Sequence, residues 1–211
     1  MTLSVTVLAL VLLVWFAAGT IWNIRKGREL MRWMQGGLPL LGERTTVRWL
    51  GSTAVEMVLR KARPPFEEAT VVIFLEPRDV PWMWALSRGR GRRDTLIVRG
   101  KLRTAPRADL EALDRASWSG RDALRSMAAG EWSVREPAVP GGLSTYYQAP
   151  AALSRADALL EVASRAGLTV RRLSVRRSEP HLQIHLAPPG DGVSAEDFFE
   201  AVRALGARAP A

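Results

Sequence analysis

The hydrophobic pattern of the chain begins with one uninterrupted apolar run. Leu3 to Trp22 are 20 residues without a charged side chain. A helix of that length covers about 30 Å, the thickness of a bilayer's hydrocarbon core. The small residues at 17–19 would suit a signal peptidase, but no Lys or Arg precedes the run, and it is longer than the roughly 7 to 15 apolar residues of a signal sequence. The pattern therefore predicts an uncleaved transmembrane anchor over residues 1–22.

Four basic side chains follow the apolar run directly: Arg25, Lys26, Arg28 and Arg32. Cationic flanks stay on the cytoplasmic side of a membrane. We therefore expect a single-pass protein of the cell (inner) membrane, with its N-terminus outside and residues 23–211 in the cytoplasm. Trp22 lies between the run and these charges, at the headgroup depth that tryptophan prefers, and is predicted to be an interface anchor.

Helical periodicity continues past the apolar run. Residues 24–35 contain no proline and place apolar side chains on one side and arginines on another. Gly36-Gly37 and Pro39 then favour the end of the helix. Residues 23–43 are thus predicted to be a basic juxtamembrane helix and linker, in which Trp33 is either a second interface anchor or a contact with the soluble domain.

Period-two alternation begins after this linker. Residues 45–50 and 54–61 alternate around Gly51-Ser52, which predicts a β-hairpin, although the second range also fits a short helical stripe. Residues 71–75 and 95–98 are continuous apolar runs, the pattern of buried strands. Weaker strand candidates are residues 108–113, 132–135 and 143–147. These ranges predict a β-rich domain over residues 44–136.

The last third of the chain mixes both periods. Ser154 is the expected N-cap of a helix to Ala166, and Gly167 is its expected end. Residues 168–176 and 181–186 alternate as strands, and Ser194 is the expected cap of a final helix. Residues 143–206 therefore form a predicted helix-strand-strand-helix unit, on the same sheet or on its own, after a boundary at 137–142. The predicted class is α+β, with a mostly antiparallel sheet.

Charge is distributed unevenly along the chain. The net charge is +9, and residues 1–104 contain 17 basic and 8 acidic side chains, while residues 105–211 contain 13 of each. The excess therefore belongs to the membrane-proximal half. Its sharpest concentration is the run from Arg88 to Arg93. This run lies in the connection from Glu76 to Asp94, whose 19 residues exceed the usual length of a connection between strands.

This connection contains tryptophans followed by arginines: Trp82, Trp84, Arg88, Arg90, Arg92 and Arg93. Pro81 suits the first turn of a short helix over the tryptophans. Aromatic residues followed by arginines are typical of a segment in a bilayer interface, where guanidinium groups meet lipid phosphates. We expect these residues and the basic side chains after the anchor to rest on anionic lipids of the inner leaflet. The alternative is that the tryptophans fold into the core and the arginines are a solvated turn.

Nucleic acid is the competing anionic partner. The Arg-Gly-Arg-Gly-Arg-Arg run resembles the glycine-arginine tracts of RNA-binding tails, but it is short and no other nucleic-acid motif accompanies it. The predicted anchor already places this charge beside lipid, so nucleic acid is the less favoured partner.

Candidate catalytic and metal-ligating residues are few. The absence of cysteine excludes disulfides, thiol nucleophiles and cysteine-ligated metals. His181 and His185 would be roughly 13 Å apart along a strand, too far to share a metal ion, and are expected on the solvent face of a sheet. The segment 117–120 is interpreted as a turn rather than a nucleophile elbow. The carboxylates Glu76, Asp79 and Asp94 are expected in ion pairs with Arg78, Arg92 or Arg93. No cofactor is predicted.

The sequence therefore favours a non-enzymatic role. We expect an adaptor or regulatory domain that is docked on the anionic leaflet and binds an unidentified protein partner. The rival interpretation is a membrane-associated enzyme that acts on an anionic lipid headgroup, with the Trp-Arg connection as its substrate clamp. A polar pocket containing Glu76 or Asp94 beside this connection would favour the enzyme.

Overall fold

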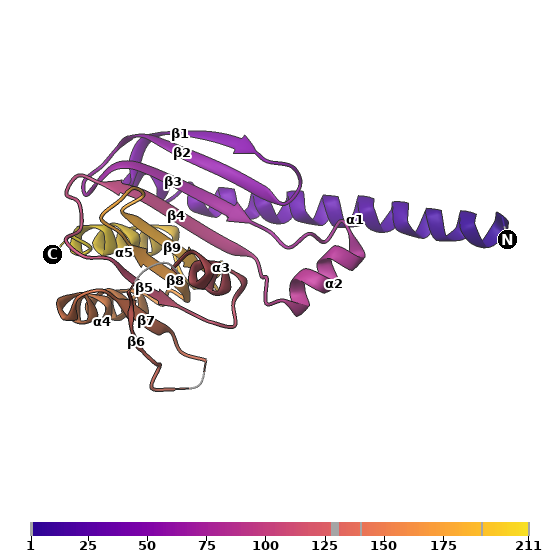
Figure 1. The fold of residues 1–211 in the computed structure, drawn as a ribbon. Helices are drawn as coiled ribbons and strands as arrows, with labels where there is room; N and C mark the ends of the chain where they lie inside the picture. Colours follow the sequence, from indigo (N-terminus) through magenta and orange to yellow (C-terminus); the bar gives the residue numbers. More distant parts are fainter. Residues whose placement is uncertain (1, 128–130, 140, 191, 211) are drawn as a thin grey trace.

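The computed structural model describes residues 2–127, 131–139, 141–190 and 192–210, and its architecture is α+β. A long N-terminal helix leads into a nine-stranded antiparallel sheet, and the chain closes with a C-terminal helix (Figure 1). The strand order is β1-β2-β3-β4-β9-β8-β5-β7-β6. The predicted class and the mostly antiparallel sheet are confirmed.

The first helix, α1 (Thr2–Met34), includes both the apolar run and the basic segment after it. Among the described residues it is the one helix long and apolar enough to cross a membrane, and none of its apolar window is buried. It ends before Gly36-Gly37, as the sequence predicts, and the short helix η1 (Leu38–Leu40) follows. Figure 1 shows the N-terminal half of α1 extending away from the rest of the molecule.

Four consecutive strands form one half of the sheet: β1 (Gly42–Trp49), β2 (Ala54–Ala62), β3 (Phe66–Phe74) and β4 (Thr95–Leu102). Residues 54–61 belong to a strand rather than to the alternative helix, because β2 pairs with β1 on one side and β3 on the other. The two continuous apolar runs are the buried strands β3 and β4, which confirms that prediction.

The other half of the sheet contains β5 (Leu110–Leu113), β6 (Ser133–Arg135), β7 (Ser144–Tyr147), β8 (Val170–Val175) and β9 (Leu182–Leu186). The three weaker strand candidates are therefore real strands. β9 pairs with β4 and joins the two halves, so the strands before and after residues 137–142 belong to one sheet.

In the described part of the chain, α2 (Pro81–Gly89), α3 (Trp118–Met127) and α4 (Pro150–Arg165) lie between strands, and α5 (Ala195–Arg208) follows the last strand. Ser194 caps α5 by accepting a hydrogen bond from the Asp197 amide, and Gly167 follows α4 with a φ of 68°, both as predicted. The prediction of Ser154 as N-cap is wrong. Proline lacks an amide hydrogen and suits the first helical position, so α4 begins at Pro150 without a side-chain cap.

The interpretation of residues 117–120 as a turn is also wrong, because α3 begins there. The Ser117 hydroxyl accepts a hydrogen bond from the Gly120 amide and so caps the first turn of the helix. The glycine is required by packing, since a Cβ at Gly120 would lie 2.0 Å from the carbonyl oxygen of Asp114. Ser117 and Gly120 therefore hold the first turn of α3 close to the loop at Asp114.

The main core lies on one face of the sheet. Val71, Val98, Ile184, Leu173 and Ala112 are paired in register across five successive strands and belong to one buried cluster. Side chains of α4, α5 and the last turn of α1 complete this cluster. The end of the predicted membrane helix is therefore part of the core of the domain.

The opposite face of the sheet carries a smaller apolar cluster under α3 and several buried polar side chains. His181 and His185 are 6% and 4% exposed, so their predicted place on a solvent face is wrong. His181 leaves solvent because its Nδ1 accepts a hydrogen bond from the Leu102 amide at 3.1 Å. His185 is covered because the start of α3 and the connection after α2 lie over this part of β9 and line one small cavity with it.

Candidate membrane interface

One stripe of α1 contacts the soluble domain, and its residues lie one turn apart. A Cβ at Gly19 would lie 2.3 Å from the carbonyl oxygen of Arg78, and a Cβ at Gly27 would lie 2.9 Å from the Trp49 ring. Asn23, midway between the glycines, is fully buried. Spacing of four residues keeps these positions on one side of a helix, so the small side chains let the domain approach the α1 backbone closely.

A network of polar groups joins α1 to the domain beside this stripe. The Asn23 amide nitrogen donates to the carbonyl oxygen of Glu76 at 3.1 Å, and its side-chain oxygen accepts from Arg78 at 3.2 Å. The Arg78 guanidinium also donates to both carboxylate oxygens of Asp94, at 3.0 and 2.9 Å. Lys26 lies 2.6 Å from the same carboxylate. The charges at the junction are therefore paired with one another.

Asp94 is the acidic centre of this network. Its side chain is 7% exposed, and this burial by itself would raise the pKa of the carboxyl. Hydrogen bonds from Arg78 and Lys26 outweigh burial and hold the pKa below its usual value of 3.8. The carboxylate therefore stays ionised at neutral pH and continues to bind both cations.

The helix α2 docks on the junction through one of its sides. Trp84 Nε1 donates to the carboxylate of Glu76 at 2.6 Å, and Arg88 pairs with the same carboxylate at 3.1 Å. The Trp84 ring also lies 6.4 Å from the ring of Trp15 in α1. Trp15 Nε1 donates to the carbonyl oxygen of Arg78 at 2.9 Å. Because Trp15 lies inside the apolar run, α2 packs beside the run rather than beyond its end.

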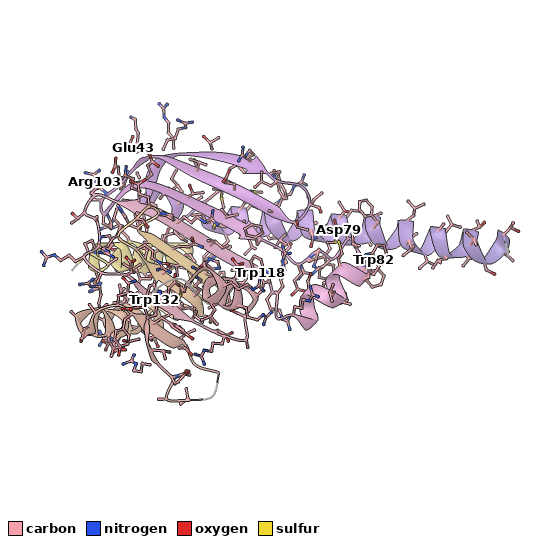
Figure 2. The ribbon with its side chains drawn as sticks, in the orientation of Figure 1. Glu43, Asp79, Trp82, Arg103, Trp118 and Trp132 are labelled. Atoms are coloured by element: carbon pink, nitrogen blue, oxygen red, sulfur yellow. The ribbon has the colours of Figure 1, made fainter. Side chains whose placement is uncertain are left out.

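The other side of α2 is apolar and exposed. Trp82, Met83 and Leu86 are 63%, 48% and 54% exposed. At about 100° per residue these three side chains cover roughly a 100° arc, opposite Trp84 and Arg88. Figure 2 shows Trp82 on the part of α2 that lies next to α1. The polar side of α2 is therefore used for docking, and about half or more of each of these apolar side chains is left exposed.

An open apolar groove of about 600 Å³ separates α1 from α2. The residues from α1 that line it are Leu10, Val11, Val14, Trp15, Ala18, Gly19 and Trp22, and Arg78 and Trp84 complete it. Neither Glu76 nor Asp94 belongs to this lining. Both carboxylates, 2% and 6% exposed, are instead occupied by the hydrogen bonds described above.

The structure divides the residues predicted for the membrane interface into three groups. Those exposed on α1 are Trp22, Arg25, Arg28 and Arg32, and those exposed on or directly after α2 are Trp82, Arg88 and Arg90. Lys26 and Trp84 are half-buried in the junction. Arg92 and Arg93 are also half-buried, but Arg92 lies over the ring of Trp118 in α3 at 5.7 Å. Trp33 is a domain contact, since its Nε1 donates to the carbonyl oxygen of Val193.

Sequence reasoning missed three residues that hold the junction together, Gly19, Asn23 and Gly27. The two glycines and the asparagine recur at a spacing of four along α1. That stripe is a readable signal for close contact with another element. Arg78 is one of the arginines predicted to pair with Asp94, and the structure confirms this pair, but its bond to Asn23, 55 residues away, had no signal in the sequence.

In comparisons with known proteins, no protein-family model and no curated protein matches the chain.

Proposed function

We propose that this protein is a single-pass membrane protein whose domain is held against the cytoplasmic leaflet by α1 and α2 together, and which acts there as an adaptor or regulatory domain. The observation that carries the proposal is the arrangement of α2. Its polar side binds Glu76, while Trp82, Met83 and Leu86 face outward beside the apolar run of α1. Lipid is the solvent that suits such a face at that position.

The depth of α2 supports this proposal. Trp15 precedes Trp22 by seven residues, or about 10 Å along a helix. If Trp22 marks the headgroup level, α2 reaches below that level and its apolar side enters the acyl region. The ion pairs of the junction then lie near the membrane, where charges occur in pairs that are shielded by protein, as Asp94 and Arg78 are. Acyl chains would fill the apolar groove between the two helices.

The exposed arginines support the cytoplasmic orientation. Arg25 and Arg28 on α1 and Arg90 after α2 are exposed close to the junction. Cationic side chains near the end of a span favour the cytoplasmic side, and each contributes about 1 kcal/mol of attraction to an anionic leaflet. The rival lipid-modifying enzyme has less support, because Glu76 and Asp94 both serve in structural pairs rather than lining the groove.

Spin labels at single cysteines test the docking, because the natural chain has no cysteine to remove. Trp82→Cys and Leu86→Cys are labelled in the full chain in nanodiscs of phosphatidylcholine and phosphatidylglycerol. Accessibility to oxygen and to a water-soluble nickel complex should place both labels about 5–10 Å below the phosphates. Val134→Cys on β6, also exposed, is the matched control and should remain in water. Labels at 82 and 86 with the aqueous accessibility of the control would contradict the proposal.

A further inference from the structure

Three arginines from separate parts of the chain meet at a small cavity on the face of the sheet opposite the main core. Arg92 and Arg93 come from the connection between α2 and β4, and Arg171 comes from β8. Ser117, Trp118 and Ser119 at the start of α3 form the facing wall. None of the described residues that line this cavity is acidic. All three arginines are half-buried, and none of them forms an ion pair with a described residue, although Nη1 of Arg93 donates to the carbonyl oxygens of Arg88 and Arg92. An anion at this cavity would therefore balance charge that the described residues leave unpaired.

The floor of the cavity contains an unsatisfied polar group. His185 lines the cavity, is 4% exposed, and its Nδ1 has no hydrogen-bond partner. The amide nitrogen of Gln183 lies 2.6 Å from Nε2 of the same ring. An amide nitrogen can only donate, so Nε2 accepts and the ring proton lies on Nδ1. Arg171 Nε is a second buried donor without a partner. Buried donors without acceptors are costly, and an oxyanion would supply the acceptor.

The start of α3 adds a third favourable feature. Its first residue is Trp118, and the exposed amides and dipole of a helix N-terminus attract anions. Figure 2 shows Trp118 on the side of α3 nearer α2. The cation of Arg92 lies over the Trp118 ring, which holds the side chain at the mouth of the cavity.

We propose that this cavity, defined by Arg92, Arg93, Arg171 and His185, is a binding site for a phosphate group. The enclosed space is about 20 Å³, enough for roughly one oxygen-sized atom. A tetrahedral phosphate fits this shape, with one oxygen inside near His185 and the others among the arginines at the mouth. The phosphate belongs either to a lipid headgroup or to a soluble phosphate compound. The site does not depend on lipid contact by α2, since none of its residues belongs to the apolar side of that helix.

Calorimetric titration of the full chain with inorganic phosphate, in phosphatidylcholine nanodiscs at constant ionic strength, tests the site. We expect saturable binding that the Arg92→Gln/Arg171→Gln variant weakens at least about tenfold, because two charge-assisted contacts are lost. Arg125→Gln, an exposed arginine on α3, is the matched control and should change the affinity less than about twofold. Absence of saturable binding, or equal affinity in the double variant, would overturn the proposal.

Two further measurements identify the source of the phosphate and the role of the floor. Phosphatidic acid in the nanodisc should compete with inorganic phosphate if the natural ligand is a headgroup, and should leave the affinity unchanged if the ligand is soluble.

The chain has two histidines, so ring ¹⁵N labelling gives two sets of signals, and His185→Gln assigns one. Phosphate should shift the Nδ1 signal of His185 and not that of His181. Labels at residues 82 and 86 report on docking separately, so a failure here leaves the membrane proposal intact.

Discussion

At the scale of single residues, the close approach of α1 to the domain depends on glycine. At Gly19 the neighbouring atoms are backbone atoms of Arg78 and Asp79, which cannot move aside as a flexible side chain can. At Gly89 in α2, by contrast, a Cβ would meet nothing within 4 Å. The two glycines therefore offer a matched comparison of the same substitution.

Gly19→Ala should loosen the junction, and Gly89→Ala should not. The added Cβ at residue 19 must displace the Arg78 backbone, at a cost of about 1–3 kcal/mol that exceeds the gain in helix propensity. Thermal unfolding in nanodiscs, monitored by tryptophan fluorescence, should show that the Tm of Gly19→Ala is lower by roughly 2–4 °C per kcal/mol of lost stability. The change at residue 89 should lie within about 0.5 kcal/mol. Equal effects of the two substitutions would show that α1 and Arg78 do not pack as described.

The buried imidazole of His185 makes the domain sensitive to acid. Burial, followed by the nearby Arg172 and Arg99 charges, lowers the pKa of His185 from 6.5 to about 3. The folded state therefore binds this proton less readily than the unfolded state. Its contribution to stability is complete above pH 6.5 and is lost as the pH falls from 6.5 towards 3.

His185→Gln should reduce this acid sensitivity. Between pH 6.5 and 4 the free energy of unfolding of the natural chain should fall more steeply than that of the variant, by at most about 1.4 kcal/mol per pH unit. Denaturant unfolding at a series of pH values measures both slopes, and the comparison cancels the carboxylates that titrate lower down. Parallel slopes would indicate that the His185 ring is solvated in the folded state.

At the scale of elements, α1 has two roles in one continuous helix. Its first half is the candidate membrane span, and its last turn supplies Met34 to the main core, next to Leu38 and Leu41 from the following segment. These three side chains are 0%, 6% and 0% exposed. The domain therefore does not begin where the membrane segment ends.

Two truncations should separate these roles. A chain that starts at residue 15 keeps the whole junction and should fold in detergent with nearly unchanged Tm. A chain that starts at residue 44 loses Met34, Leu38 and Leu41. Each loss of a large core side chain costs about 2–5 kcal/mol, against a typical total stability of about 5–15 kcal/mol. Circular dichroism and limited proteolysis should show that the shorter chain is unfolded or aggregated. A cooperative unfolding transition of that chain would contradict the assigned role of α1.

Elements with a strong local pattern could be predicted from the sequence. Contacts between segments that are far apart in the sequence could not. The apolar run, the β1–β2 alternation and the Ser194 cap all have their cause within a few residues. The Ser154 prediction is wrong because Pro150 already begins α4 four residues earlier, and the turn prediction at residues 117–120 is wrong because Ser117 and Gly120 fix the start of α3 there. The burial of His185 depends on segments far away in sequence, the start of α3 and the connection after α2, and alternation along β9 does not place them.

The candidate membrane interface shows the same difference between local patterns and long-range contacts. The outward face of Trp82 and the exposed arginines belong to a local pattern of aromatic and basic residues, so the sequence could indicate them. The ion pairs between α1 and the domain could not be assigned in this way, because their partners are far apart in the sequence. The sequence predicts that Glu76 and Asp94 pair with nearby arginines, and Arg78 does bind Asp94. Asp94 also binds Lys26, which is 68 residues earlier and comes close because α1 lies along the sheet.

At the scale of the whole molecule, the excess positive charge serves more than one surface. The membrane-proximal half carries all of the net +9. The arginines exposed near the junction are Arg25, Arg28 and Arg90. Arg78 forms an ion pair with Asp94, and Arg92 lines the cavity at α3. A single total for the chain therefore conceals an exposed group, a structural group and a group that pairs with no carboxylate among the described residues.

Because α1 is one continuous helix, its N-terminal half and the domain are joined rigidly. No glycine-rich hinge lies between the apolar run and Met34, and the stripe of contacts from Trp15 to Gly27 clamps the domain to the helix axis. A span that tilts to match bilayer thickness must then swing the whole sheet by the same angle. Membrane thickness would thus set which face of the domain, including the arginine-lined cavity, is presented to the lipid surface.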